Sequence, residues 1–408
     1  MNETASPAVV IVGGGMAGGL LACLLAAADV PVTVLDAGPP PQSPEGDADL
    51  RVSAINMASR QLLAACDVWQ KLDDQRIAPY TRMEVQDSDG AGQLVFTAAD
   101  AGASDLGWII ENSNTVAALW ARACELGVDW RCQTPVTDIR RGAHGWLVVP
   151  AAGDAIEASL LVGADGARSR VRAAAGIPAP VRDTGHRAIV ASVGTSRAHE
   201  GCARQWFLPT GPVALLPLFG DGCHSSLVWS TTPAESERLM NLPADEFAAA
   251  LAVASEHQLG DVVLASERQV FPIMNLHASD YVRDGLALIG DAAHVVHPLA
   301  GQGINLGMLD AGLLAEELLR ARRRGPGLAH VSALKRYQRR RRGHNALMQA
   351  SFIGLKGLFE HDQLPIRWLR NTGMRLVNDT PFVKKRFARA ALGVEGDLPE
   401  AARQRTLA

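Results

Sequence analysis

The sequence predicts an α/β fold in which a strand–helix–strand domain is interrupted by a mostly antiparallel β-sheet. Residues 8–35 are predicted to form a strand, a glycine turn, a helix and a second strand. Residues 186–272 change to short β-prone segments separated by Pro-Gly turns, and residues 286–320 return to a strand followed by a long helix. Because strand and helix alternate on both sides of the insert, the first domain is expected to be discontinuous.

This organisation predicts three parts of the chain. The first domain is Rossmann-like, the second is the inserted sheet, and the third is helical. Side chains of the inserted sheet are expected either to line a substrate cavity or to form ordinary core. Their expected limits are 1–75, 101–185 and 273–340 for the first domain, 76–100 and 186–272 for the second, and 341–408 for the third.

Composition narrows the class of protein. The chain has 408 residues, is 48% hydrophobic and carries a net charge of -4, so it has enough apolar residues for large cores and no overall attraction to nucleic acid. Its six cysteines form no C-x-x-C pair, which favours reduced thiols in a cytoplasm. Residues 5–28 are uncharged, but the Gly13–Gly15 break and the lack of a positive leader exclude a signal peptide or a span. Any membrane contact is therefore expected to be peripheral, at the inner face.

The first motif is a glycine turn between strand and helix. Gly13, Gly15 and Gly18 match G-x-G-x-x-G, with Ala17 in the same turn, and Asp36 ends the second strand. Gly13 permits the tight turn, Gly15 lets the backbone approach a pyrophosphate, and Gly18 allows close helix packing. An acidic residue at Asp36 suits a ribose hydroxyl and would repel a 2'-phosphate. The alternative is an ordinary tight turn with no ligand.

Two further junctions carry a carboxylate next to glycine. Asp165 and Gly166 follow a strand-like run and precede a helix-prone run, and Asp291 follows the strand-like residues 286–289. With the first motif they form a three-part pattern that resembles the FAD-dependent class of single-component aromatic hydroxylases, with a para-hydroxybenzoate-hydroxylase-like fold. That resemblance implies that the three motifs bind the ADP part, the pyrophosphate region and the ribityl chain of FAD.

Residues 297–310, with the sequence HPLAGQGINLGMLD, narrow the resemblance to the ubiquinone-biosynthesis hydroxylases, and residues 51–56 and 207–218 agree with it. The resemblance implies an FAD-dependent monooxygenase that uses NADH or NADPH and O2, through a flavin hydroperoxide, to hydroxylate a lipid-tailed phenol or benzoquinol. The chain has no second complete glycine motif, so the NADH or NADPH is expected to bind transiently. Other ubiquinone-biosynthesis proteins are the partners it suggests. Arg51 is implied to lie near the flavin or its pyrophosphate.

The same segment supplies the candidates closest to the reaction. Gly301, Gly303, Ile304 and Asn305 begin a helix whose free N–H groups would stabilise negative charge on a reduced flavin ring. His297 and the carbonyl of Pro298 are the candidate catalytic groups. For His297, activation of a phenol and a plain hydrogen bond to the loop are both open.

The recurrence of Asp291, His294 and His297 every third residue also raises a metal site. Such ligands converge only on a continuous helix or a tight loop, and Pro298 argues against the helix, so no metal is expected. Residues 111–114 depart from the family pattern, and their contacts stay open.

Ten Lys or Arg lie between Arg320 and Arg342, with no acidic residue among them. A solvated helix face or a partner surface explains this stretch. Attraction to anionic lipid is the alternative, because the apolar-rich residues 346–359 follow. Two rival functions also stay open: a flavin-dependent reductase or dehydrogenase of an isoprenoid, and a non-catalytic FAD-binding subunit of a quinone-biosynthesis complex.

Overall fold

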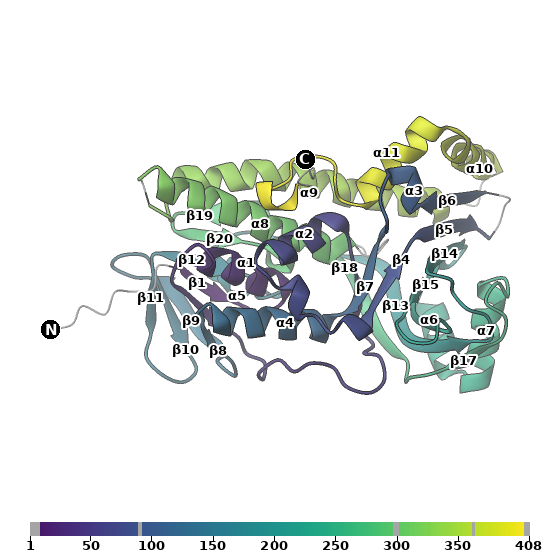
Figure 1. The fold of residues 1–408 in the computed structure, drawn as a ribbon, viewed down its shortest axis with the longest axis horizontal. Helices are drawn as coiled ribbons and strands as arrows, with labels where there is room; N and C mark the ends of the chain where they lie inside the picture. Colours follow the sequence, from purple (N-terminus) through teal and green to yellow (C-terminus); the bar gives the residue numbers. More distant parts are fainter. Residues whose placement is uncertain (1–8, 89–91, 297–301, 326, 361–363, 404–408) are drawn as a thin grey trace.

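The structure is a computed structural model that describes residues 9–88, 92–296, 302–325, 327–360 and 364–403. Two large sheets stand at opposite ends of the molecule, and helices α8 and α9 run along it (Figure 1). None of the helices in these ranges combines the length and hydrophobicity that crossing a bilayer requires.

A six-stranded sheet forms the first end, in the order β19-β20-β12-β1-β2-β8. Every pair is parallel except β19–β20. Its strands are β1 (Val9–Val12), β2 (Val32–Leu35), β8 (Asp129–Arg131), β12 (Leu160–Gly163), β19 (Val282–Arg283) and β20 (Leu286–Leu288). The inner strands are apolar except for Thr33 of β2, because helices cover both faces of a parallel sheet. The covering helices α1 (Met16–Ala26), α4 (Asn112–Glu125) and α8 (Gln302–Arg323) pack against one another through α1.

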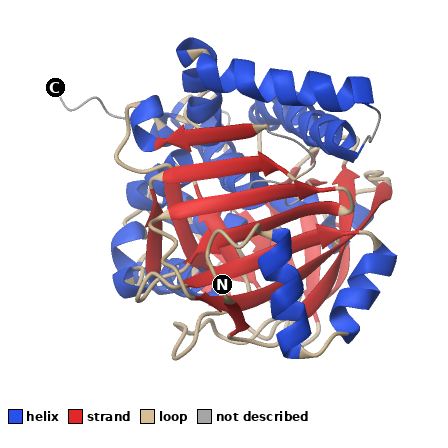
Figure 2. Ribbon diagram, turned by 90° about the vertical axis from the view of Figure 1, so that its right-hand side faces the viewer, coloured by secondary structure: helices blue, strands red, loops and turns tan. Residues whose placement is uncertain are grey.

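A nine-stranded sheet forms the other end, and Figure 2 shows its strands spread across the molecule with helices around them. Its order is β21-β18-β13-β16-β15-β14-β5-β6, with β17 paired to β13, and only β14–β5 is parallel. The strands are β5 (Arg82–Asp87), β6 (Gln93–Thr97), β13 (Val181–Thr195), β14 (Cys202–Leu208), β15 (Gly211–Pro217), β16 (His224–Thr231), β17 (Val262–Leu264), β18 (Gln269–His277) and β21 (His294–Val295).

The two faces of this sheet differ in side-chain size. Alternation along β16 directs Leu227 and Trp229 to one face, where they pack with Phe247 and Leu251 beneath helices α6 (Pro233–Asn241) and α7 (Ala244–Ala254). The opposite face carries mostly small side chains and borders a cavity. The large side chains therefore form a core on one side and leave room on the other.

The remaining elements are shorter. They are sheets β3-β7-β4 and β11-β10-β9 together with small helices. Their bounds are β3 (Val52–Ile55), β4 (Ile77–Tyr80), β7 (Gly107–Glu111), β9 (Val136–Arg141), β10 (Trp146–Pro150), β11 (Ile156–Ala158), α2 (Met57–Ala65), α3 (Ala98–Ala101), α5 (Arg170–Ala174), η1 (Trp69–Lys71), η2 (Asp74–Arg76), η3 (Gly290–Ala292) and η5 (Glu400–Ala402).

Three helices end the chain: α9 (Val331–Glu360), α10 (Leu364–Asp379) and α11 (Pro381–Ala391). Helix α9 packs along α8, while α10 packs on β6 and α11 on α3. The C-terminal part is therefore helical, as the sequence predicts.

Four of the ten basic residues from Arg320 to Arg342 form ion pairs with described residues. Arg320, Arg336 and Arg340 surround Glu317, at distances of 3.2, 2.7 and 3.0 Å from its carboxylate oxygens. Arg341 is fully buried against Asp310 at 2.6 Å. A solvated face is therefore the wrong interpretation for Arg341. Arg336 and Arg340 of α9 hold that helix against α8, whereas Arg320 pairs within α8 itself.

The predicted strands and helices are found close to their expected positions, including the parallel β1–α1–β2 unit and the antiparallel insert. The expected limits at 186 and 272 fall inside β13 and β18, because both strands continue toward the six-stranded sheet. The division of the chain into domains stays a prediction.

Candidate active site

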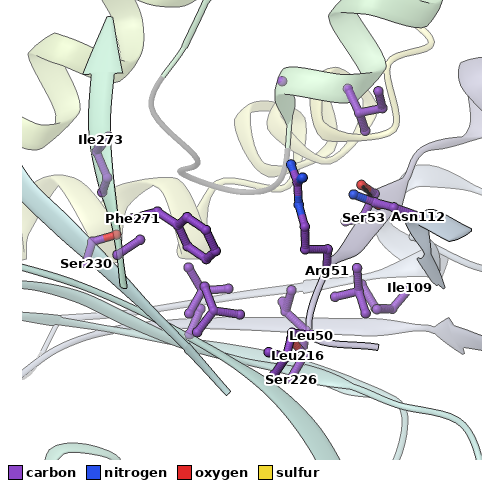
Figure 3. A pocket seen from close by; sticks show the side chains of 18 of the residues that line it. Leu50, Arg51, Ser53, Ile109, Asn112, Leu216, Ser226, Ser230, Phe271 and Ile273 are labelled. Carbon is purple, nitrogen blue, oxygen red and sulfur yellow. Dashed lines mark hydrogen bonds between the residues drawn. The ribbon is translucent and has the colours of Figure 1, made fainter. Parts of the chain in front are cut away.

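A cavity of about 540 Å³ lies between the small-residue face of the nine-stranded sheet and the ends of the nucleotide-binding elements (Figure 3). Both parts of the chain contribute to its walls. They include Met16, Arg51, Ser53, Asn112, Asp291, Gly303 and Ile304 on one side, and Ala188, Ala203, Ala214, Ser226, Val228, Ser230 and Phe271 on the other. The predicted residues Arg51, Asp291, Gly303 and Ile304 thus border one space with the inserted sheet.

The sheet side of the cavity is a floor of short side chains. Ser226, Val228 and Ser230 alternate along β16 on the cavity face, next to Ala214 of β15. The Ser226 hydroxyl is buried and has no hydrogen-bond partner in the part of the chain that the structure describes. A buried hydroxyl without a partner costs free energy, so it marks a place where a ligand can donate or accept.

Arg51 and Asp291 give the opposite wall its charge. Arg51 extends into the cavity, with its guanidinium directed toward the ribbon that begins α8 (Figure 3). Asp291 is exposed, but into the cavity, where the surrounding protein removes most solvent. This desolvation raises the pKa of Asp291, and electrostatic interactions with His294 and Arg51 oppose the rise.

A second cavity of about 480 Å³ lies at the first glycine motif. Gly14, Gly15, Asp36, Ser113 and Trp130 are among its lining residues. The Asp36 carboxylate accepts hydrogen bonds from the backbone N–H of Gly14 at 2.5 Å and of Gly38 at 2.6 Å, which fixes its position. The indole Nε1 of Trp130 has no acceptor among the described residues.

Three helix N-termini lie along the two cavities. Helix α1 begins after Gly15, α4 begins at Asn112, and α8 begins at Gln302. None of the three has an acidic residue in its first turn, and neither α1 nor α4 has a side-chain cap. Their free N–H groups and positive dipole ends therefore favour an anionic ligand that extends from one cavity to the other.

A buried ionic cluster supports the Asp291 segment from behind. Asp310 lies 2.5 Å from Nε2 of His294, accepts from the backbone N–H of Gly290 at 3.0 Å, and accepts from Arg341 at 2.6 Å and Asn345 at 3.1 Å. Burial alone would raise the pKa of Asp310, but His294 and Arg341 hold it well below its usual range. His294 faces inward while Asp291 faces the cavity, so the two side chains of the suspected metal motif diverge.

Several predicted cofactor residues have mainly structural contacts. A Cβ on Gly13 would meet the carbonyl of Ala164 at 2.3 Å, and one on Gly18 would meet the carbonyl of Gly13 at 2.0 Å. Gly13 also has a φ of +104°, which favours glycine. Ala17 lies against Gly290, where a Cβ would approach its methyl group to 3.3 Å. These positions build the turn, and their direct contact with a cofactor stays a prediction.

Asp165 and Asn305 are likewise engaged locally. Asp165 accepts from Ser169 at 2.5 Å and from the backbone N–H of Arg170 at 2.7 Å, at the start of α5, and Gly166 after it has a φ of +78°. Asn305 is buried and joins α8 to the β3–α2 segment by accepting from Asn56 at 3.0 Å and donating to the carbonyl of Ala54 at 2.8 Å. Their predicted cofactor contacts stay predictions.

The candidate catalytic residues His297 and Pro298, and the candidate cofactor residue Gly301, lie outside the described residues. The described chain brings both sides of this segment, Val296 and Gly303, to the same cavity.

Comparison with known proteins gives a consistent result. Residues 6–351 match the family model described as "FAD binding domain". The 3-demethoxyubiquinol 3-hydroxylase of Escherichia coli is 37% identical over 389 residues, covering 95% of this chain and 98% of that protein. The ubiquinone hydroxylase UbiL of Rhodospirillum rubrum is also 37% identical, covering 94% and 89%.

The chain belongs to the FAD-dependent ubiquinone-biosynthesis hydroxylase family. Its fold is that of p-nitrophenol 4-monooxygenase PnpA from Pseudomonas putida, with a TM-score of 0.76 and 18% identity over 98% of this chain and 99% of that one. The para-hydroxybenzoate-hydroxylase-like fold and the flavoprotein monooxygenase class predicted from the sequence are confirmed.

The residues present fit FAD. A Cβ on Gly15 would meet no protein atom within 4 Å, although its neighbours Gly13, Gly14 and Gly18 are tightly enclosed. Free space at this one glycine, beside the uncapped start of α1, suits a pyrophosphate that approaches the backbone. With the pyrophosphate there, Asp36 would face the adenosine part of FAD in the second cavity, and Arg51 and Asp291 would face its flavin part in the first.

Sequence reasoning missed several lining residues. Asn112 borders the first cavity and Ser113 the second, so the start of α4 lies between them, whereas Glu111 pairs with buried Arg76 at 2.7 Å. Trp130 and Phe271 were also missed. Trp130 could have been found from the sequence, because it lies in the strand-like stretch that pairs with β2 in the parallel sheet. No local sequence pattern distinguishes Phe271 from a residue of the hydrophobic core.

Proposed function

We propose that this protein hydroxylates the aromatic ring of a lipid-tailed phenol or benzoquinol intermediate of ubiquinone biosynthesis, using NADH or NADPH and O2. The observation that carries the proposal is the cavity of about 540 Å³ that joins the flavin-side residues Arg51 and Asp291 to a floor of short, mainly apolar side chains. Relatives of more than a third identity are named as hydroxylases of ubiquinol or ubiquinone, which supports this substrate class.

FAD, when bound, supplies electron transfer from NADH or NADPH and activation of O2 for ring hydroxylation. The chain supplies position and electrostatics. The start of α8 directs N–H groups into the cavity at Gly303 and Ile304, where they stabilise negative charge. Arg51 adds a positive charge on the same side, and Asp291 accepts hydroxyl hydrogen bonds.

The substrate ring is placed by shape and by few polar contacts. The short side chains of Ala188, Ala214 and Ser230 leave space for a flat ring above the sheet, and Phe271 projects into the cavity beside it (Figure 3). We assign the Ser226 hydroxyl to a hydroxyl or carbonyl oxygen of the ring, because it is buried in the floor with no partner among the described residues. His297 and the Pro298 carbonyl remain the proposed groups closest to the reacting ring.

Purified protein should contain FAD and should oxidise NADH or NADPH faster when a prenylated phenol is added. Labelled oxygen from O2 should appear in the product. A product without label would instead identify a reductase or dehydrogenase of an isoprenoid, and a folded protein without flavin would refute the proposal. Deleting the gene and identifying the accumulated quinone precursor by mass spectrometry would establish the ring position.

The non-catalytic alternative is separated by cofactor variants. Gly15→Val and Asp291→Ala should impair FAD retention and stop quinone production in cells. If production continued in a variant that retains no FAD, the protein would act as an assembly subunit instead.

Within the cell, we propose a cytoplasmic protein in peripheral contact with the inner face of the membrane, where a lipid-tailed substrate is held, and in contact with other ubiquinone-biosynthesis proteins. Fractionation at low and high salt tests the location, because peripheral contact predicts release from membranes as salt rises.

A further inference from the structure

Helices α10 and α11 expose three large apolar side chains. Leu376 is 65% exposed, Phe382 is 77% exposed and Phe387 is 54% exposed. The two helices pack against each other, and both lie at the upper right of Figure 1 beside α3 and β6. Exposed apolar groups gathered on adjacent elements mark an interaction surface.

The opposite side of these helices is anchored to the protein. Lys384 lies 3.2 Å from Asp100 of α3, and Asn378 accepts from the backbone N–H of Val95 of β6 at 3.4 Å. Ala388 is fully buried. Each helix therefore already packs one face against the protein. The exposed apolar residues lie on a second face of these helices.

The charge of the segment is strongly positive. Residues 364–391 contain seven Lys or Arg and one Asp, in a chain whose net charge is -4. Lys385 and Arg386 are exposed beside Phe382 and Phe387, and no ion pair is recorded for either in the described chain. A helix that binds the surface of an anionic membrane typically combines exposed Phe and Leu with Lys and Arg that have no acidic partner.

This face is also connected to the cavity by apolar packing. Val296 lines the cavity and packs in one cluster with Phe207 and Leu306, against which Met348 and Phe359 of α9 are packed. The rings of Phe207 and Phe359 stack with centroids 3.7 Å apart. Helix α9 also contacts α10, so α9 joins this apolar cluster at the cavity wall to the exposed helices.

We propose that the outer face of α10 and α11, made of Leu376, Phe382, Lys385, Arg386 and Phe387, docks on an anionic lipid bilayer. The apolar side chains enter the headgroup region and the cations contact lipid phosphates. The docking would orient the Val296 side of the cavity toward the bilayer. This gives a specific surface to the peripheral membrane contact proposed above. That the bilayer also supplies the substrate rests on the proposed function, whereas vesicle binding is measured without any substrate.

The stretch 320–342 is a weaker candidate for the same role. Arg320, Arg336, Arg340 and Arg341 are paired with Glu316, Glu317, Asp310 or Asp397. The other six cations of this stretch are exposed, but Val331 is the only exposed large apolar side chain among its described residues. The stretch therefore lacks the apolar face that α10 and α11 present to a bilayer.

Flotation of the FAD-loaded full chain with vesicles tests the proposal without any substrate. Vesicles of phosphatidylcholine with phosphatidylglycerol should capture the protein, pure phosphatidylcholine should capture much less, and added salt should release it. The variants Phe382→Ala/Phe387→Ala and Lys385→Glu/Arg386→Glu should each weaken capture on the order of tenfold. FAD content and NADH or NADPH oxidation with a detergent-solubilised phenol should be unchanged in both.

Matched controls lie away from this face. Val253→Ala/Val263→Ala removes similarly exposed apolar groups from α7 and β17, and Arg323→Glu/Arg324→Glu reverses two exposed charges at the end of α8. Both should retain capture by anionic vesicles. Equal capture by neutral vesicles, or no loss in the α11 variants, would overturn the proposal. So would a wild-type protein that ignores vesicles but loses a protein partner in those variants.

Discussion

Ser226 and Ser225 show how one position in a strand decides the role of a hydroxyl. Both are buried, and both hydroxyls lack a partner among the described residues. Because side chains alternate along β16, Ser226 borders the cavity while Ser225 faces the other side of the sheet. Only Ser226 can contact a ligand in that cavity.

Replacing Ser226 with Ala should raise the KM for a prenylated phenol by about three- to tenfold, the value of one ordinary hydrogen bond. FAD absorbance should stay the same, because the floor is opposite the flavin-side residues. Steady-state kinetics of Ser226→Ala and Ser225→Ala check this. An equal rise of KM in the Ser225 variant would show that the effect comes from the sheet and not from a contact.

Asp310 contributes to stability, because it joins α8, α9 and the Gly290 backbone through buried hydrogen bonds. Asp310→Asn should lower the free energy of unfolding by about 3–5 kcal/mol, because Arg341 would stay buried without a counter-ion. Urea unfolding measures this loss. In Asp310→Asn/Arg341→Met the loss should be smaller than the sum of the two single losses.

The same carboxyl predicts a dependence on pH. Its pKa is below the ordinary value of 3.8 in the folded protein, so its stabilising contribution is present above that value and is lost as the pH falls below it. Wild-type protein should therefore lose more stability than Asp310→Asn between about pH 5 and about pH 3. Parallel loss in both proteins would assign acid unfolding to other carboxyls.

Among the elements, those with a local signal were predicted and those fixed by distant contacts were not. The β1–α1–β2 unit is visible because apolar runs, glycines and Asp36 occur at the spacing that the turn requires. The start of α8 is visible for the same reason. The inward direction of Arg341 is not visible in a run of arginines, although Tyr337, Arg341 and Asn345 recur every four residues and mark one buried face of α9.

The site shows the same division. Arg51, Asp291, Gly303 and Ile304 border the cavity as the motifs predict, whereas the contributions of Asn112 and Phe271 depend on how separate sheets approach each other. No local sequence pattern predicts how close these sheets come to each other. The ion pairs of Arg336 and Arg340 were not predicted for a related reason. Their acidic partners Glu316 and Glu317 lie on the preceding helix, α8.

The α8–α9 pair offers a test at the scale of elements. Glu317 is 1% exposed and receives three arginines, so Glu317→Gln should lower the free energy of unfolding by about 3 kcal/mol. Glu235→Gln on α6 is the matched control, because its partner Arg238 is largely exposed and the expected loss is below about 1 kcal/mol. Urea unfolding compares them. Similar losses would show that the cluster on Glu317 is not what holds the helices together.

At the scale of the whole molecule, the two cavities lie along elements from both ends of the chain. The second cavity belongs to the six-stranded sheet and α4, and the first is completed by the nine-stranded sheet. A single bound FAD would contact both groups of elements. The cofactor is therefore expected to stabilise the protein as well as to equip it for reaction.

Removing FAD should lower the unfolding temperature, and adding it back should restore the loss in proportion to the logarithm of its concentration. At a free concentration of about 100 times Kd the gain in the free energy of unfolding is about 2.7 kcal/mol.

Gly15→Ala is the sharpest control. The φ of Gly15 is -69° and its surroundings are free, so the apoprotein can hold a methyl group at the place where the pyrophosphate is expected. Its apoprotein should melt like wild type, yet FAD should stabilise it less. Gly18→Ala should instead destabilise the apoprotein, since its methyl group would meet the Gly13 carbonyl. Equal stabilisation of wild type and Gly15→Ala by FAD would place the pyrophosphate elsewhere.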